Sequence, residues 1–150
     1  MLQNLKNILL DILKKKGFSY MVLVDDEKSF GVQFPLGDTV FTIHILPTQI
    51  NDLPYAIVIN APVVVGLKPV PNLLLYLLNS NLQIPLGGFG FFGDTVIYKH
   101  SITDNDLTEE ELERILSVSA NIVLNYANII INTFGGRMAL DFPPNFNLQA

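Results

Sequence analysis

Apolar residues recur at three- and four-residue spacing in two segments, which lie near the two ends of the chain. The first covers residues 2–13, and its apolar positions are Leu2, Leu5, Ile8, Leu9, Ile12 and Leu13. The second runs from Thr108 to Phe134, and its apolar positions are Leu112, Ile115, Leu116, Ile122, Val123, Tyr126 and Ile130. This spacing places the apolar side chains of each segment on one face of a helix. The sequence therefore predicts an amphipathic helix near each end of the chain.

The second predicted helix has recognisable start and stop signals. Thr108 and Glu111 have the spacing of a capping box, in which each side chain accepts a hydrogen bond from the other residue's backbone N–H. Glutamates crowd the first turns, where the positive end of the helix dipole favours anions. Gly135 and Gly136 follow the last apolar position, as is typical of a helix C-terminus. We therefore expect one helix from Thr108 to Phe134.

Segments rich in β-branched and aromatic residues lie between the two helices and predict strands over residues 18–24, 30–34, 39–46 and 55–61. Pro35 is expected to end the second of these strands, and the segment 47–54 is expected to be a loop. Proline residues then introduce a short helix that is apolar almost all round and should be deeply buried, residues 71–78. A hairpin is predicted over residues 83–102, with its turn at Gly93 and Asp94.

The order of these elements indicates the fold class. Strands follow one another instead of alternating with helices, which favours an α+β domain. We expect a mainly antiparallel sheet of about five strands with the helices packed on one side, in the order α-β-β-β(-β)-α-β-β-α. A single domain is predicted over residues 1–136, and an irregular C-terminal tail over residues 137–150.

The composition is unusually apolar for a single domain. Hydrophobic residues make up 49% of the chain and charged residues only 15%, against roughly 25% charged residues in an ordinary soluble domain. A chain with so little charge must expose apolar surface or bury it against a partner, so we expect a homodimer or a protein partner. The formal net charge of −5 argues against a nucleic-acid surface, which needs clustered basic residues.

Several kinds of site and segment are not expected. The chain has no cysteine, which excludes disulfides, thiolate catalysis and the usual structural zinc sites. No signal peptide is recognisable at the N-terminus, and the apolar run 56–67 is shorter than the roughly 20 residues of a membrane span. We therefore expect a soluble cytoplasmic protein without a membrane segment.

The glycine-rich hairpin offers one alternative function. Gly88, Gly90 and Gly93 match the spacing of a dinucleotide-binding loop, but the residues that follow form a strand and not the helix that this motif requires. No cofactor is therefore predicted. The aromatic residues of the hairpin could instead line a pocket for a small molecule, and they are Phe89, Phe91, Phe92 and Tyr98.

The two histidines carry the enzyme alternative, which the sequence favours least. His44 lies in a predicted strand and points away from the face that carries Phe41, Ile43 and Ile45. His100 shares the parity of Tyr98 in the hairpin. Neither has a second histidine or an acid at metal-ligand spacing. We expect no catalytic residues and no metal.

An uncharged polar stripe follows the C-terminal helix. Asn121, Asn125, Asn128 and Asn132 recur at spacings of four, three and four, where a solvated face usually carries Lys and Glu. Plain surface polarity is the simpler explanation. The alternative is an interface, in which the amides hydrogen-bond to a second helix or to a partner beside Ile122 and Ile129.

A family resemblance rests on the second half of the chain. The segment Pro71–Asn81, the hairpin with its glycines and phenylalanines, and the segment Leu107–Leu112 resemble the YbjN-like domains, which share the fold of type III secretion chaperones. Small uncharacterised cyanobacterial proteins look similar too. The resemblance implies a small acidic domain, often dimeric, that binds protein segments instead of turning over a substrate. The leading hypothesis is thus a non-catalytic, chaperone- or adaptor-like domain.

Overall fold

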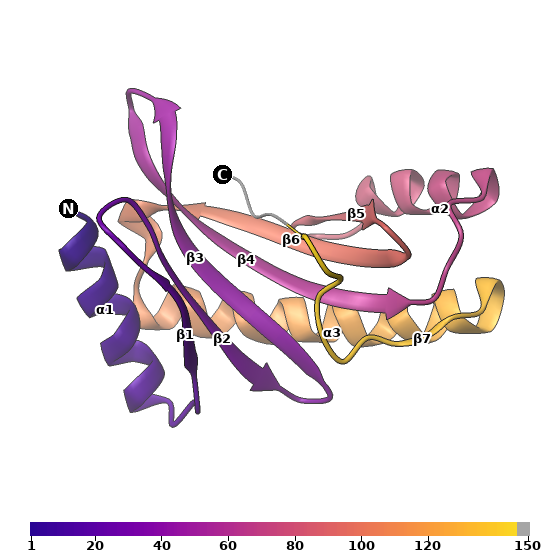
Figure 1. Ribbon diagram of the computed structural model, residues 1–150, viewed down its shortest axis with the longest axis horizontal. Helices are drawn as coiled ribbons and strands as arrows, with labels where there is room; N and C mark the ends of the chain where they lie inside the picture. Colours follow the sequence, from indigo (N-terminus) through magenta and orange to yellow (C-terminus); the bar gives the residue numbers. More distant parts are fainter. Residues whose placement is uncertain (147–150) are drawn as a thin grey trace.

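An antiparallel sheet of seven strands and three α-helices make up the computed structural model, which describes residues 1–146 (Figure 1). The helices are α1 (Leu2–Lys15), α2 (Pro71–Asn81) and α3 (Glu109–Phe134). The strands are β1 (Met21–Asp25), β2 (Phe30–Leu36), β3 (Thr39–Ile50), β4 (Leu53–Val65), β5 (Gly88–Phe92), β6 (Thr95–Thr103) and β7 (Arg137–Met138). A 3-10 turn, Asp104–Asp106, connects β6 to α3.

The predicted α+β class and element order are confirmed, but the sheet has more strands than the expected five. The strand order is β1-β2-β3-β4-β6-β5, and β7 pairs with the end of β4. The short strand β7 lies within the segment that was expected to be an irregular tail. Its partners Val64 and Val65 are the last residues of β4, so the chain returns to the middle of the sheet after α3.

Prolines end fewer strands than expected. The segment 47–54 is not a loop, because β3 and β4 continue through it to a two-residue turn at Asn51 and Asp52. The end of this hairpin extends beyond the other strands in Figure 1. Proline can stay in a strand where no ladder hydrogen bond is lost. Pro35 lies past the last β1 partner of β2, and Pro47 and Pro62 each adjoin a shift of register.

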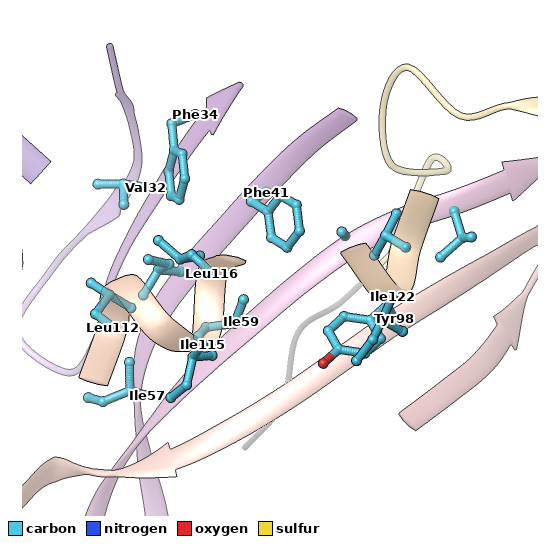
Figure 2. Close-up of a cluster of buried hydrophobic side chains, with 14 of the residues drawn as sticks. Val32, Phe34, Phe41, Ile57, Ile59, Tyr98, Leu112, Ile115, Leu116 and Ile122 are labelled. Carbon is cyan, nitrogen blue, oxygen red and sulfur yellow. The ribbon is translucent and has the colours of Figure 1, made fainter. Parts of the chain in front are cut away.

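The main core lies between one face of the sheet and helices α1 and α3. Figure 2 shows Leu112, Ile115, Leu116 and Ile122 of α3 facing side chains of the sheet. The sheet residues labelled there are Val32, Phe34, Phe41, Ile57, Ile59 and Tyr98, and all are buried. The helices cover this one face, as predicted.

Among the described helices, α3 is long and apolar enough to cross a membrane by length and composition alone. Its buried apolar residues form part of this core, whereas Leu124 and Ile129 are exposed.

Helix α2 is less buried than its composition predicts. Leu73 and Leu77 enter the core, but Leu75 is 57% exposed and Leu78 is 63% exposed. The ring of Tyr76 lies near rings of α3, which places α2 on the same side of the sheet as α3. The expected deep burial is therefore wrong: the helix packs by one face and exposes leucines on the other.

The start of α3 confirms half of the predicted capping box. The backbone N–H of Glu111 donates to Thr108 Oγ1 at 3.2 Å. The Thr108 N–H donates instead to the carbonyl of Asp106 at 2.9 Å, and the Glu111 carboxylate pairs with Arg114. The 3-10 turn before the helix supplies the acceptor that Glu111 was expected to supply. Gly135 follows the helix with a φ of 93°, a conformation that favours glycine.

Candidate functional site

An apolar groove lies between α1 and α3, and we call it the α1–α3 groove. Its larger hollow, of about 400 Å³, is lined mainly by Ile12, Phe18, Leu36, Leu112, Leu116 and Ala120. A second hollow of about 150 Å³ shares Leu36, Ala120 and Asn121 with the first and continues to Val123 and Leu124. The groove therefore follows α3 for about three turns, and its size is in the range of known binding pockets.

Ion pairs hold the two helices together at one end of the groove. Lys16 Nζ lies 2.7 Å from a Glu113 oxygen and 3.4 Å from a Glu109 oxygen, and Lys15 pairs with Glu109 at 2.8 Å. The hydrogen bond that Lys16 donates to Glu113 raises the pKa of Lys16, and the one that Lys15 donates to Glu109 lowers the pKa of Glu109. These pairs are close to solvent and add little stability, but they position α1 against α3. Beyond these residues, Asp38 is the one charged residue that the described part of the chain contributes to the lining of the two hollows.

The asparagine stripe of α3 begins in this groove and leaves it. Asn121 lines both hollows and donates from Nδ2 to the Ser117 carbonyl at 3.1 Å. Asn125, Asn128 and Asn132 are exposed. Two apolar residues were predicted to lie beside them: Ile129 is 45% exposed, whereas Ile122 is only 7% exposed and belongs to the core. The surface along the second half of α3 therefore combines amides with Leu124 and Ile129.

The two outer edges of the sheet differ. Strand β1 pairs only with β2 among the described strands, and its residues Met21, Val22 and Leu23 are 57%, 48% and 41% exposed. At the other edge, the Asn81 carboxamide accepts from Phe89 N at 2.7 Å and donates to Phe89 O at 3.1 Å. Asn81 thus occupies the hydrogen-bonding groups that an added strand would need on β5. Three consecutive apolar residues form this edge, but nothing in the sequence pattern distinguishes β1 from an inner strand.

The aromatic residues proposed for a small-molecule pocket are divided between the two faces of the sheet. The ring centroid of Phe89 lies 5.8 Å from that of Tyr98 and 4.9 Å from that of Tyr126. Phe91 is half-buried, and the ring centroid of Phe92 lies 5.4 Å from that of Phe146. The Tyr98 hydroxyl donates to the Leu86 carbonyl and lies 3.2 Å from Ser119 Oγ. Burial raises the pKa of Tyr98. Phe89 and Tyr98 are core residues.

The two histidines lie on opposite faces of the sheet. His44 pairs with Val58 of β4, and His100 pairs with Ile59, the next residue of that strand. His44 is 4% exposed, and burial lowers its pKa to about 4, so its imidazole is neutral at neutral pH. Burial also lowers the pKa of His100. The histidines therefore share no site. Within residues 1–146, no group of three or more potential metal ligands lies together.

A family of known proteins and a solved structure are similar to this chain. The family described as T3SS (YopN, CesT) and YbjN peptide-binding chaperone 1, or TY-Chap1, matches residues 3–142. A solved structure of similar fold is the Yersinia pestis type III secretion chaperone SycH in complex with a stable fragment of YscM2. The two chains are 14% identical, with a TM-score of 0.55, over 81% of this chain and 98% of SycH, so the likeness concerns the fold. The comparison with curated protein sequences gives no match.

Proposed function

Because the chain belongs to the TY-Chap1 family of peptide-binding chaperones, we propose that it binds an apolar segment of a partner protein in the α1–α3 groove. The protein acts by holding this segment and catalyses no reaction. The observation that carries the proposal is the groove itself, a mainly apolar hollow of about 400 Å³ whose charged residues, Lys16 and Glu113, are paired with each other at one end. Apolar side chains of a bound segment would leave water there, which is the main source of affinity for such segments.

The open edge of the sheet supports a role for the backbone of the bound segment. Phe18 lines the groove and lies three residues before β1, whose outer edge has no neighbouring strand among the described residues. An extended segment that leaves the groove could add to β1 as a further strand, with main-chain hydrogen bonds that do not depend on its sequence. This arrangement suits a chaperone, which must bind a segment before it folds.

We further propose that two copies associate through the exposed side of α3, where Leu124 and Ile129 lie among the asparagines. Amides can hydrogen-bond across such an interface without burying a charge. The Asn125→Glu/Asn128→Glu variant would place charges there and should shift a dimer to a monomer in native mass spectrometry. A dimer of unchanged stability in this variant would remove the interface. The acidic, weakly charged chain is expected to act in the cytoplasm, without nucleic acid or membrane as a partner.

The groove is tested with an arginine placed inside it. Ser117 is exposed and lines the larger hollow, so the side chain of Ser117→Arg would fill the groove without disturbing the core. Peptides are first selected from a random 12-residue library on the wild-type protein, and their affinities are then measured by fluorescence polarisation. We expect Ser117→Arg to weaken binding by about tenfold or more, equivalent to about 1.4 kcal/mol.

Thr133→Arg is the matched control, because Thr133 is exposed on the same helix and does not line either hollow. This variant should bind the selected peptides as the wild type does. Equal affinities for all three proteins, or a library from which no peptide is selected, would contradict the proposal.

A further inference from the structure

Residues 139–146, which we call the tail segment, lie over part of the sheet face opposite the helices. It follows β7, and its first residue, Ala139, is buried. The rings of Phe142 and Phe146 stack at 5.4 Å, and Phe146 meets Phe92 of β5 edge-on at 5.4 Å. Figure 1 shows the chain turning back from β7 over the strands. The tail segment thus lies where a bound peptide would lie on this face.

A hollow of about 390 Å³ remains between the tail segment and the sheet. Its lining includes Leu23 of β1, Thr42, His44 and Leu46 of β3, and both tail phenylalanines. No Lys or Arg contributes to the lining, and Asp141 does. Asp141 belongs to the tail segment, and the part of the lining that the sheet contributes has no acidic residue. The hollow is therefore suited to groups that combine aromatic or apolar surface with hydrogen-bonding atoms.

Polar atoms at this face have no hydrogen-bond partner. Thr42 Oγ1 and His44 Nδ1 are both unpaired, and their side chains are 2% and 4% exposed. Asn60 pairs with Thr42 across β3 and β4, and both polar atoms of its amide are unpaired as well. Unpaired buried polar groups destabilise a protein, so they are rare unless a ligand or another group pairs with them. The tail segment places two aromatic rings on this face but leaves polar atoms of three side chains without a hydrogen-bond partner.

We propose that this helix-free face is a second peptide-binding site, which takes an extended partner segment with two aromatic side chains in place of the tail segment. The partner's aromatic rings replace those of Phe142 and Phe146, and its amide groups pair with Thr42 and His44. The proposal rests on the proposed function, since it assigns a second surface to a peptide-binding protein. Once the tail segment has left, the described lining carries neither a carboxylate nor a Lys or Arg, because its one acid, Asp141, leaves with that segment. The site therefore selects aromatic rings and amide groups and not charge.

The covalent connection makes the tail segment a competitor. A segment tethered by a short connection has an effective concentration in the millimolar range, so a partner must bind strongly to displace it. The apparent affinity for the partner falls by the fraction of molecules in which the face is open. Weakening the tail segment should therefore strengthen the binding of a peptide added in solution.

The test uses the full-length protein and a fluorescein-labelled peptide with the sequence of residues 139–146, Ala-Leu-Asp-Phe-Pro-Pro-Asn-Phe. In the Phe142→Ala/Phe146→Ala variant we expect the peptide to bind at least about tenfold more tightly than to the wild type, by fluorescence polarisation. Leu140→Ala is the matched control, because Leu140 is 84% exposed in the same segment and should leave the affinity unchanged. A peptide in which both phenylalanines are alanine should not bind.

The outcomes separate this inference from the proposed function. In the double-alanine background, Ser117→Arg should leave binding of the 139–146 peptide unchanged, because the α1–α3 groove lies on the other face of the sheet. A loss of binding on Ser117→Arg would overturn the second site and leave the groove proposal standing. The second site would also be overturned if the 139–146 peptide bound equally well to the wild type and to the double-alanine variant, or bound to neither. If only the library peptides fail to bind, the proposal for the α1–α3 groove is contradicted and the second site is not.

Discussion

The imidazole of His44 lies directly over the α-carbon of Gly31 on the neighbouring strand. The two residues are cross-strand partners in the β2–β3 ladder. A Cβ placed on Gly31 would lie 2.3 Å from His44 Cδ2 and 2.5 Å from Nε2, far inside van der Waals contact. Glycine is therefore required here by the side chain opposite and not by its own backbone conformation.

We expect Gly31→Ala to destabilise the protein by about 1–3 kcal/mol, because the ring of His44 or the strand must move. Gly90→Ala is the control: Gly90 also lies in a strand, and a Cβ there would meet nothing within 4 Å. That change should be neutral or slightly stabilising. Urea denaturation measures both. In a His44→Ala background the cost of Gly31→Ala should largely disappear, and an unchanged cost there would show that the ring is not responsible.

The buried imidazole should make stability depend on pH. Its pKa is about 4 in the folded protein against an ordinary value of 6.5, so the unfolded chain binds the proton more readily. This contribution to stability is complete above pH 6.5 and is lost as the pH falls from 6.5 towards 4. The folding equilibrium constant should change by up to about tenfold per pH unit in this window.

His44→Gln should flatten that dependence between pH 5 and 6.5, above the range in which most carboxylates titrate. His100→Gln should remove a smaller part of the pH dependence of stability, since burial lowers the pKa of His100 while the negative charge of Glu111 opposes that shift. The measurement is urea denaturation at a series of pH values. A wild-type slope retained in His44→Gln would assign the dependence to other groups.

Two buried threonines should respond in opposite ways to valine. Thr42 Oγ1 has no partner, so Thr42→Val removes an unpaired hydroxyl at nearly constant volume and should leave stability unchanged or raise it. Thr95 is fully buried and donates to Asp94 Oδ1 at 2.8 Å, so Thr95→Val should cost about 1 kcal/mol. Thermal unfolding of the two variants gives the comparison. A destabilised Thr42→Val would mean that its hydroxyl is paired in solution.

The carboxamide of Asn81 should protect the edge of β5. Removing it in Asn81→Ala leaves the N–H and carbonyl of Phe89 without their partners, at a cost of about 1–3 kcal/mol. The Phe89 amide should then exchange its hydrogen faster in NMR experiments. Asn79→Ala, an exposed asparagine near the same helix end, is the control. An unchanged exchange rate at Phe89 in Asn81→Ala would contradict this role.

Local signals in the sequence predict the helices and most strand positions. The cap at Thr108, the stop at Gly135 and the alternation that turns His44 away from Phe41, Ile43 and Ile45 all agree with the structure. Each depends on residues within a few positions of one another. The prediction was wrong at Pro35 and Pro47, because whether a proline ends a strand depends on the register of the strand beside it.

The binding surfaces could not be derived in the same way. The α1–α3 groove joins Ile12 to Leu116, and the helix-free face joins Thr42 to Phe142, so both depend on contacts between residues about one hundred positions apart. No local pattern indicates that the tail segment returns to the sheet. The sequence also does not predict the two hydrogen bonds between Asn81 and Phe89, because an asparagine after a leucine-rich helix is an ordinary stop signal.

The unequal edges of the sheet limit how copies of this protein can assemble. An edge strand is a template for growth, and a sheet with two open edges can add copies at both ends and form a fibre. Here the Asn81 carboxamide occupies the N–H and carbonyl of Phe89 on β5, so β1 is the more open of the two outer edges among the described strands. If β1 meets β1 of a second copy, the contact is symmetric and covers this edge in both molecules. Growth along the sheet edges then stops at two molecules, and a strand that another protein adds to β1 would occupy that edge in place of a second copy.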